Sequence, residues 1–433
     1  MKGQTYIEEI ADHVGQEVLI RGWLYNLRSS GKIHFLLVRD GTGVMQAVIV
    51  KNDVPKEVFE LARRLTQESS IKIRGTVRAD PRAPGGYELS VTGLELVQLA
   101  EQEYPIALKE HGAGFLLDQR HLWIRTPRQA AILRVRHEVM QAVRDFFNRR
   151  GFIATEAPIL TPTAVEGTTT LFAVNYFDDK AYLTQSGQLY LEATAMALGR
   201  VYWIGPTFRA ERSKTRKHLT EFWMAEAEAA YFDHEDNLRL QEELVRYIVA
   251  RAVERRHKEL EQLERDIELL KSEIERPFAR ITYAEALEIL KEKGRKIEWG
   301  KDFGAPEEEA LGDHFGRPVF VEALPAEIKA FYMQPLPDDP KLVLAADLIG
   351  PEGYGELIGG SQRIHDLQLL EERLEQFGLP RKPYEWYLDL RRYGSVPHSG
   401  FGLGIERTVA WICGLRHVRE AIPFPRQLYR LTP

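Results

Sequence analysis

Hydrophobic and polar positions alternate over short stretches between Val18 and about Val97. The runs are EVLIRGWLYNLRSSGKIHFLLVRDGTGVMQAVIV, SIKIRGTV and YELSVTGLELV, with Gly-containing turns between them. One helical stretch, VPKEVFELARRL, follows the third predicted strand. Period-two alternation predicts half-buried strands, and about five strands with a helix after the third is the order of an OB-fold barrel. We therefore predict that residues 1–100 form a small β domain with a face for single-stranded nucleic acid.

A second pattern begins near Arg128, after residues 101–127, which carry no clear periodicity and are predicted to be a hinge. Apolar residues at helical spacing predict a helix as far as Arg150, with Gly151 at its C-terminus. Its apolar stripe consists of Ile132, Val135, Val139, Val143 and Phe146. This helix opens the larger predicted domain, residues 128–433.

Strand-like and helical runs then alternate, with YLTQSGQLY, RVYWIGPTF and EFWMAEAEAAY as the strand-like ones. This mixture predicts an α+β domain around an antiparallel sheet. The stretch from about 234 to 293 is more highly charged, and we interpret it as a helical insertion. Its apolar residues at helical spacing are Leu260, Leu263, Ile267 and Leu270.

The composition narrows the class of protein. A chain of 433 residues, 44% hydrophobic and 28% charged, is typical of two or three globular domains. It has no apolar leader and no run of 18 apolar residues, which predicts a cytoplasmic protein without a membrane partner. The single cysteine, Cys413, lies in the apolar run VAWICGL and is predicted to be a buried structural thiol. The net charge of −6 leaves room for a local basic surface.

Residues 207–231, TFRAERSKTRKHLTEFWMAEAEAAY, combine charge with an aromatic side chain. Alternation predicts Arg209 and Glu211 on one strand face, then a basic loop, then a second strand that presents Phe222, Met224, Glu226 and Glu228. Such a hairpin can hold a phosphate through its arginine and stack a base on its aromatic ring. A surface hairpin with a solvated basic turn explains the spacing equally well.

Two glycine-rich segments carry further candidate chemistry. In SGFGLGIERTVAWICGL, residues 399–415, alternate glycines leave one strand face bare, and Arg407 follows in the first turn of a predicted helix. Bare backbone and a helix N-terminus favour a phosphate, although glycine strands also occur where two backbones pack. In DLIGPEGYGELIGGSQRIHD, residues 347–366, Asp347 and Glu356 can hold Mg²⁺ beside phosphates, or they belong to a polar turn.

Together, FRAER with EFWMAEAE, GFGLGIERTVAWI and GFIATEAPIL resemble the three signature motifs of class II aminoacyl-tRNA synthetases. The preceding barrel indicates the aspartate, asparagine and lysine subgroup, and the resemblance covers essentially the whole chain. It implies that ATP is bound by Arg209 at the α-phosphate, by Glu211 at the adenine amino group and by Phe222 and Arg407 on the two adenine faces. Arg407 would also reach the γ-phosphate.

The resemblance further assigns His218 to ATP binding and Glu356, with Asp347, to Mg²⁺. Arg209, Arg407 and Glu356 would be the catalytic residues. The implied reaction joins an amino acid to ATP as an aminoacyl-adenylate, then transfers it to tRNA without a protein nucleophile. The basic loop, residues 212–218, would meet the acceptor stem. The family places Pro158 at a dimer interface, which implies a homodimer, although a Pro here is also a simple turn device.

The resemblance also implies a pocket for the amino acid, and the text QSGQLYLE suggests which one. Aspartate enzymes show QSPQLYKQ, in which the Lys supplies a cation for the β-carboxylate, and Leu191 stands in that position here. Glu192 follows it. A pocket without that cation would bury the aspartate carboxylate with its charge poorly compensated, which costs roughly several kcal/mol, so a neutral amide fits better. This resembles asparaginyl enzymes and implies asparagine and tRNA(Asn) as substrates. The implied pocket residues are Glu166, Ser186, Gln188, Leu191, Glu226 and Arg363.

In this subgroup the barrel reads the central U of the anticodon. The matching positions are Phe35 and Gln46, with Arg28 nearby. An exposed aromatic ring flanked by Arg and Gln suits an unstacked base. Alternation alone favours Phe35 as part of the barrel core, and the resemblance reverses this interpretation.

Three alternatives remain open from the sequence. An aspartyl-tRNA synthetase, discriminating or not, is the nearest. An asparagine synthetase derived from the same catalytic core is a second, although such relatives lack the barrel. A catalytically silent paralogue that binds RNA is a third, and the retention of both phosphate-binding arginines and the metal carboxylate argues against it.

Overall fold

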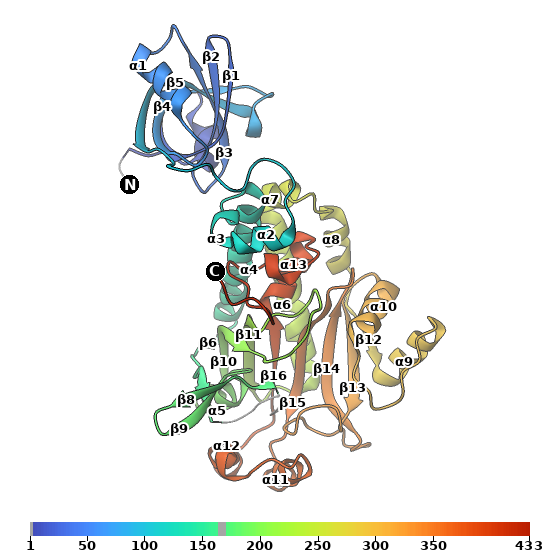
Figure 1. Cartoon of the computed structure of the whole chain (residues 1–433). Coiled ribbons are helices and arrows are strands. Elements are labelled where there is room, and N and C mark those ends of the chain that lie inside the picture. Colours follow the sequence, from blue (N-terminus) through green and yellow to red (C-terminus); the bar gives the residue numbers. More distant parts are fainter. Residues whose placement is uncertain (1–2, 163–169) are drawn as a thin grey trace. The chain divides into compact units, whose positions relative to one another are not determined.

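The computed structural model describes residues 3–162 and 170–433 (Figure 1). The chain divides into two compact units, Met1–Ala130 and Ala131–Thr432, which are described separately.

The first unit contains a closed barrel of five strands in the order β1-β2-β3-β5-β4. Every second residue along each strand points into the barrel, where Leu24, Leu36 and Ile49 are fully buried. A helix follows the third strand, so the predicted OB-fold order is confirmed. The elements are β1 (Glu17–Ser30), β2 (Ile33–Arg39), β3 (Val44–Val50), α1 (Lys56–Arg64), β4 (Ser70–Ala79) and β5 (Tyr87–Gln98).

The predicted hinge is tied to the barrel by a buried carboxylate. Glu68 accepts hydrogen bonds from Arg39 of β2 and from Arg125, the latter at 3.1 Å. A buried charge is tolerated when it is paired in this way. Within the predicted hinge, residues 113–123 form two short helices. The remaining elements of this unit are η1 (Ile7–His13), η2 (Pro84–Gly86), α2 (Ala113–Asp118) and α3 (Arg120–Trp123).

The second unit is built on an eight-stranded sheet in the order β12-β13-β14-β15-β16-β11-β10-β6. Its central strands pair antiparallel, while the edge pairs β12–β13 and β10–β6 are parallel. A small second sheet has the order β7-β9-β8. The α+β prediction is therefore confirmed. The strands are β6 (Ile153–Ala154), β7 (Leu160–Thr161), β8 (Ala173–Tyr176), β9 (Asp179–Leu183), β10 (Arg200–Phe208), β11 (Glu221–Ala230), β12 (Ala279–Thr282), β13 (Val319–Pro325), β14 (Leu342–Gly350), β15 (Gly355–Arg363) and β16 (His398–Gly404).

The first long helix lies where the apolar stripe predicts it. All five stripe residues are fully buried, and Gly151 adopts a positive φ of 73° beyond the helix end. The helices are α4 (Pro127–Arg149), α5 (Gln188–Leu198), α6 (His234–Arg255), α7 (His257–Gln262), α8 (Ile267–Glu275), α9 (Tyr283–Glu292), α10 (Ala305–Phe315), α11 (Leu367–Gln376), η4 (Lys382–Tyr384), α12 (Glu385–Arg392), α13 (Ile405–Cys413) and η5 (Val418–Glu420).

The stretch at 234–293, predicted to be a helical insertion, is helical but belongs to the core. Helix α6 packs Leu244 and Ile248 into the main apolar cluster beside the sheet. Strand β12, which follows α8, pairs with β13 and forms one edge of the same sheet (Figure 1). The high charge of this stretch does not mark it as peripheral, because some of its charged side chains are buried and paired. Arg251 of α6 pairs with Glu138 at 2.6 Å, and Glu273 of α8 accepts from the Trp411 indole at 2.9 Å.

Three of the strand predictions were also wrong in detail. YLTQSGQLY is a strand only as far as Leu183, and helix α5 begins at Gln188. FRAER is not a strand beyond its first residue. Strand β10 ends at Phe208, and Arg209 and Glu211 lie in the loop that follows. GFIATEAPIL, which the motif resemblance implies to be one strand with Pro near its end, contains only β6 and the first residue of β7. Pro158, which cannot donate a ladder hydrogen bond, lies between them.

Two predictions from composition can be compared with the structure. The thiol of Cys413 is buried in the main core, as expected. Among the described residues, no helix is both long and apolar enough to cross a membrane.

Candidate active site

One face of the central sheet carries a continuous row of functional side chains. Along β11, Phe222, Met224, Glu226 and Glu228 share one face, as the sequence predicts, and Trp223 and the buried Ala225 and Ala227 lie on the other. The neighbouring β16 is paired so that its glycines lie opposite these residues, with Gly402 beside Glu226. Strand β15 continues the row on the other side of β16. The face therefore has side chains at its flanks and bare backbone along its middle.

All six residues assigned to ATP line one pocket at the end of this row. They come from three segments far apart in the sequence, and Lys217, Leu219, Met224, Leu357, Gly402, Gly404, Glu406 and Val418 line the same pocket. The guanidinium carbon of Arg209 lies 5.4 Å from the centroid of the Phe222 ring, a cation–π geometry. The pocket thus offers an aromatic face with cations around it. The six are Arg209, Glu211, His218, Phe222, Glu356 and Arg407.

The loop between β10 and β11 is ordered around His218. Its Nδ1 contacts the hydroxyls of Ser213, at 3.2 Å, and Thr215. Its Nε2 lies 3.9 Å from Glu211. Burial and the positive charge of Arg407 lower the pKa of His218 below its ordinary value. A neutral imidazole near pH 7 can therefore accept or donate one hydrogen bond in the pocket.

Helix α13 is held against the sheet by a residue that the sequence analysis did not select. Glu406 accepts a hydrogen bond from the Trp223 backbone N–H at 2.9 Å and pairs with Arg136 at 2.7 Å. The next residue, Arg407, donates to the backbone carbonyl of Glu356. Because Glu406 locks the first turn of the helix, the Arg407 guanidinium is directed into the pocket. The signal available in the sequence was an acidic residue, Glu406, directly before the motif arginine.

The two carboxylates assigned to Mg²⁺ face the same small space. A Cβ at Gly359 would lie 2.7 Å from Glu356 Oε1 and 3.7 Å from Asp347 Oδ1, so the missing side chain makes room for the Glu356 carboxylate beside Asp347. Lys329, which the sequence analysis missed, pairs with Asp347 at 2.6 Å. Burial raises the pKa of Asp347 to about 7; Lys329 opposes this rise and Glu356 adds to it.

Two carboxylates suit a Mg²⁺ ion whose other ligands are phosphate oxygens and water. Within residues 3–162 and 170–433, no group of three or more His, Cys, Asp or Glu side chains gathers in a way that could hold a metal. Mg²⁺ commonly takes one or two carboxylates and completes its octahedron with phosphate oxygens and water. Two hard oxygen donors beside the ATP pocket are consistent with that pattern.

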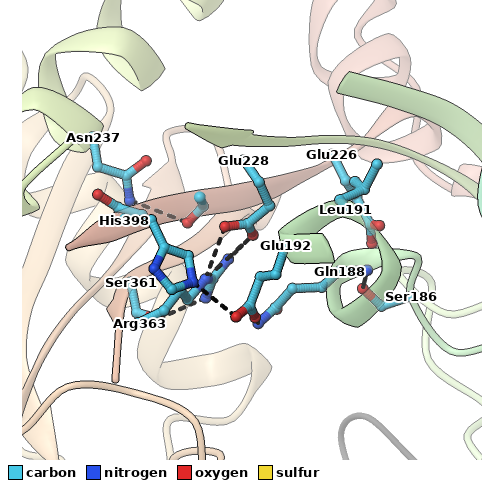
Figure 2. A network of polar contacts seen from close by, with 12 residues as sticks. Ser186, Gln188, Leu191, Glu192, Glu226, Glu228, Asn237, Ser361, Arg363 and His398 are labelled. Atoms are coloured by element: carbon cyan, nitrogen blue, oxygen red, sulfur yellow. Dashed lines mark hydrogen bonds and ion pairs between the residues drawn. The ribbon is translucent and has the colours of Figure 1, made fainter. Parts of the chain in front are cut away.

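Farther along the sheet face lies a fully buried ion pair (Figure 2). Arg363 of β15 donates to both carboxylate oxygens of Glu228 on β11 and, at 2.6 Å, to the hydroxyl of Ser361. Both charged side chains are 2% exposed. Burial lowers the pKa of Arg363, but Glu228 reverses this effect and raises it overall, so the guanidinium stays charged. Burial also raises the pKa of the Glu228 carboxyl to about 7, and the Arg363 guanidinium opposes this rise and favours the carboxylate form. The sequence analysis placed Glu228 on this face but gave it no role.

A second buried carboxylate lies next to this pair (Figure 2). Glu192 of α5 accepts hydrogen bonds from Arg391 at 2.7 Å, His398 at 2.9 Å, Tyr387 at 2.8 Å and Gln188 at 3.1 Å. Burial opposes ionisation, but Arg391 and His398 outweigh it and lower the pKa of Glu192. The carboxylate form of Glu192 is therefore favoured, and it accepts from the Gln188 amide and orients it.

The remaining candidates for the amino-acid site fall into three groups. Ser186 is buried just before α5, and Glu226 of β11 reaches the same point, where its Oε2 accepts from the Gly187 N–H at 2.7 Å. Leu191 is fully buried in an apolar cluster with Ala157, Ala195, Val201 and Trp203. These neighbours give Leu191 a packing role, and its assignment to the amino-acid pocket stays a prediction. Glu166 lies outside the described residues.

The glycines of β16 do not all serve a ligand. Gly402 and Gly404 line the ATP pocket, as the bare face predicts. At Gly400, however, an added Cβ would lie 2.1 Å from Glu228 Oε1 and 2.3 Å from the Ala227 carbonyl oxygen. The space at Gly400 is thus occupied by the protein's own carboxylate.

The three anticodon candidates lie on the outside of the barrel. Phe35 is absent from the barrel core and half-buried, and the Arg28 guanidinium carbon lies 5.0 Å from its ring centroid. Gln46 is on the neighbouring strand on the same face and donates to Glu88 at 3.2 Å. Alternation placed Phe35 in the core, but the strand has the opposite phase because His34 and Leu36 point inward.

Comparison with known proteins gives a consistent result over the whole chain. A family described as tRNA synthetases class II (D, K and N) matches residues 113–428, and an OB-fold nucleic acid binding domain matches residues 18–97. The asparagine–tRNA ligase of Desulforamulus reducens is 65% identical over 429 residues, which is 99% of each chain.

Solved structures agree with the sequence comparison. The asparaginyl-tRNA synthetase of Pyrococcus horikoshii, complexed with asparaginyl-adenylate, is 50% identical with a TM-score of 0.96 and covers 100% of both chains. An aspartyl-tRNA synthetase from Entamoeba histolytica is 28% identical with a TM-score of 0.84, covering 99% of this chain and 92% of that one. The resemblance found in the three motifs is confirmed: this chain belongs to the asparagine–tRNA ligase family of class II aminoacyl-tRNA synthetases.

Proposed function

We propose that this chain activates asparagine with ATP and transfers it to tRNA(Asn). The observation that carries the proposal is the pocket in which Arg209, Glu211, Phe222 and Arg407 meet, close to the Glu228–Arg363 pair on the same sheet face. The Pyrococcus horikoshii relative contains asparaginyl-adenylate, which is the intermediate of this reaction.

In the first step, a carboxylate oxygen of asparagine attacks the α-phosphorus of ATP, and the bond to the bridging oxygen breaks to release pyrophosphate. Arg209 would hold the α-phosphate, while Phe222 and Arg407 enclose the adenine and Glu211 accepts from its amino group. Positioned cations lower the barrier because negative charge accumulates on phosphate oxygens. In the second step, a terminal ribose hydroxyl of the tRNA attacks the acyl carbon and AMP leaves.

Glu356, with Asp347, would hold Mg²⁺ at the phosphates. The ion would neutralise charge on the departing pyrophosphate. The chain itself contributes the two carboxylates, for which Gly359 leaves room, and the Lys329 ammonium, which keeps Asp347 in place.

Selection of asparagine over aspartate is proposed to rest on Glu228 and Arg363. The amide of asparagine carries one acceptor, which suits the guanidinium, and an NH₂ donor, which suits the carboxylate. An aspartate β-carboxylate would instead meet Glu228 as a like charge in a buried site. Sites that pair a polar substrate group discriminate by roughly 10⁴ to 10⁵ without editing.

The barrel is proposed to bind the anticodon of tRNA(Asn). Phe35 offers a ring on the outer face, with the Arg28 guanidinium over the ring and Gln46 one strand away. An aromatic ring next to a cation binds an unstacked base by stacking and electrostatic attraction.

A homodimer is proposed on the basis of exposed apolar residues around Pro158. Ile153, Ile159 and Leu160 are between 42% and 46% exposed on or beside the short strands β6 and β7. Adjacent exposed aliphatic side chains mark interaction surfaces more often than isolated ones do. A second copy of the chain would cover them.

ATP–pyrophosphate exchange tests the adenylation step. With Mg²⁺, asparagine is expected to support exchange, aspartate is not, and removal of Mg²⁺ or the substitution Glu356→Gln should reduce the rate at least tenfold. Exchange mainly with aspartate would overturn the specificity. Absence of exchange with either amino acid would overturn the proposed reaction.

Glu228→Gln tests the amide-binding pair. Loss of a buried charged partner should lower kcat/KM for asparagine by about 100-fold and narrow the preference over aspartate, because the repelling charge is gone. KM for ATP should stay within about twofold of the wild-type value. If asparagine activation is unchanged, Glu228 does not contact the side chain of the substrate.

Phe35→Ala tests the anticodon face. Base stacking contributes about 1–3 kcal/mol, so KM for tRNA(Asn) in aminoacylation should rise roughly 10- to 100-fold. Pyrophosphate exchange, which does not need tRNA, provides the control and should remain at the wild-type rate. An unchanged KM for tRNA would show that the ring does not stack on a base.

Ile159→Asp tests the dimer. Sedimentation velocity should give the wild type a mass twice that of one chain and the variant a mass close to one chain, because a carboxylate is costly to bury in an apolar interface. Val97→Asp, at a 58% exposed residue of the barrel, is the matched control and should leave the dimer intact. A dimer that survives Ile159→Asp would place the interface elsewhere.

A further inference from the structure

A partly hidden ion pair joins the basic loop to helix α10. Lys217 Nζ lies 3.3 Å from Glu308 Oε2, and each side chain is only 14% exposed. The resemblance assigned the basic loop to the acceptor stem. Lys217 instead lines the ATP pocket, and its partner comes from a helix 91 residues later in the chain. A charge pair this sheltered is stronger than a pair in open solvent.

The Lys217 and Glu308 side chains pack against the backbone of Gly355, directly before Glu356. Gly355 has a positive φ of 75°, and a Cβ there would lie 2.3 Å from Glu308 Oε2 and 2.8 Å from Lys217 Nζ. Only a glycine permits this approach, because it combines the left-handed conformation with an absent side chain. Glu356, the next residue, and Lys217 therefore border the same end of the pocket.

Charged groups of both signs surround Glu308 at this end of the pocket. Burial raises the pKa of the Glu308 carboxyl, Arg407 counters the rise and Glu356 adds to it, so Glu308 lies close enough to both pocket residues to feel their charge. The lysine side chain is long and flexible, and without an acceptor it would lose its fixed place. An ammonium has three donors, so Lys217 can keep Glu308 and still donate to another oxygen.

We infer that Glu308 is a positioning residue: it holds the Lys217 ammonium at the pocket wall beside Glu356, ready to bind the polyphosphate of ATP. The inference rests on the proposed function, because the pocket must take ATP for Lys217 to meet a phosphate. It adds a cation to Arg209 and Arg407, and it gives helix α10 a role in nucleotide binding. The basic loop then serves ATP through Lys217 as well as through His218.

The test compares four variants by pyrophosphate exchange with asparagine. Glu308→Gln and Lys217→Met should each raise KM for ATP roughly tenfold, since a charge-assisted contact to phosphate is weakened or lost, and KM for asparagine should not change. The double variant should match Lys217→Met, because Glu308 acts only through the lysine. Glu309→Gln, an exposed carboxylate next along the same helix, is the control and should behave as the wild type.

The outcomes separate this inference from the proposed function. A wild type without asparagine-dependent exchange would overturn the proposed function itself. An active wild type with unchanged KM for ATP in Glu308→Gln would overturn only the positioning role. Equal rises in KM for ATP and KM for asparagine, or additive effects in the double variant, would overturn the positioning role. Glu308 would then stabilise the fold and would not act through Lys217. Thermal unfolding of each variant shows whether a loss of stability accompanies the change.

Discussion

The site depends on the pairing of charges that the central sheet removes from water. Transfer of an ion into a protein interior costs several kcal/mol, roughly, and only close partners with good geometry recover it. Arg363 meets this condition through Glu228 and Ser361, and Glu192 meets it through Arg391 and His398. These pairs are rigid because neither member can turn away without leaving an unpaired charge. A substrate amide at this point would encounter donors and acceptors already in place, which is the condition for selective binding.

Space for these charges is created by glycines on the neighbouring strands. Gly400 leaves room for the Glu228 carboxylate, Gly359 for the two carboxylates proposed to hold Mg²⁺, and Gly355 for the pair formed by Lys217 and Glu308. In each case a methyl group would meet a polar atom within 3 Å. The glycines of this sheet are thus matched to particular side chains of the protein as much as to a ligand.

Helices that look peripheral in the sequence hold this arrangement together. Helix α6 fills the main core under the sheet, α10 carries Glu308 to the pocket, and α12 supplies the Arg391 partner of Glu192. Helix α13 is fixed by Glu406, which contacts both β11 and α4. The pocket is therefore a product of the whole second unit, and the three motifs line it only because these contacts fix their ends.

The sequence by itself determined the barrel, the α+β class, the long apolar helix and the family, since these follow from periodicity and from short motifs that keep their order. It also identified the six pocket residues, because they lie in the segments through which the chain resembles class II synthetases; spacing alone left a solvated surface hairpin equally possible. Tertiary structure alone decided that Leu191 packs in an apolar cluster and that helix α6 belongs to the core. It also decided that Glu228 pairs with Arg363 and that Glu308 and Lys329 face the site. These outcomes depend on strand register and on partners up to 135 residues away, and a charge in a sequence does not reveal its distant partner.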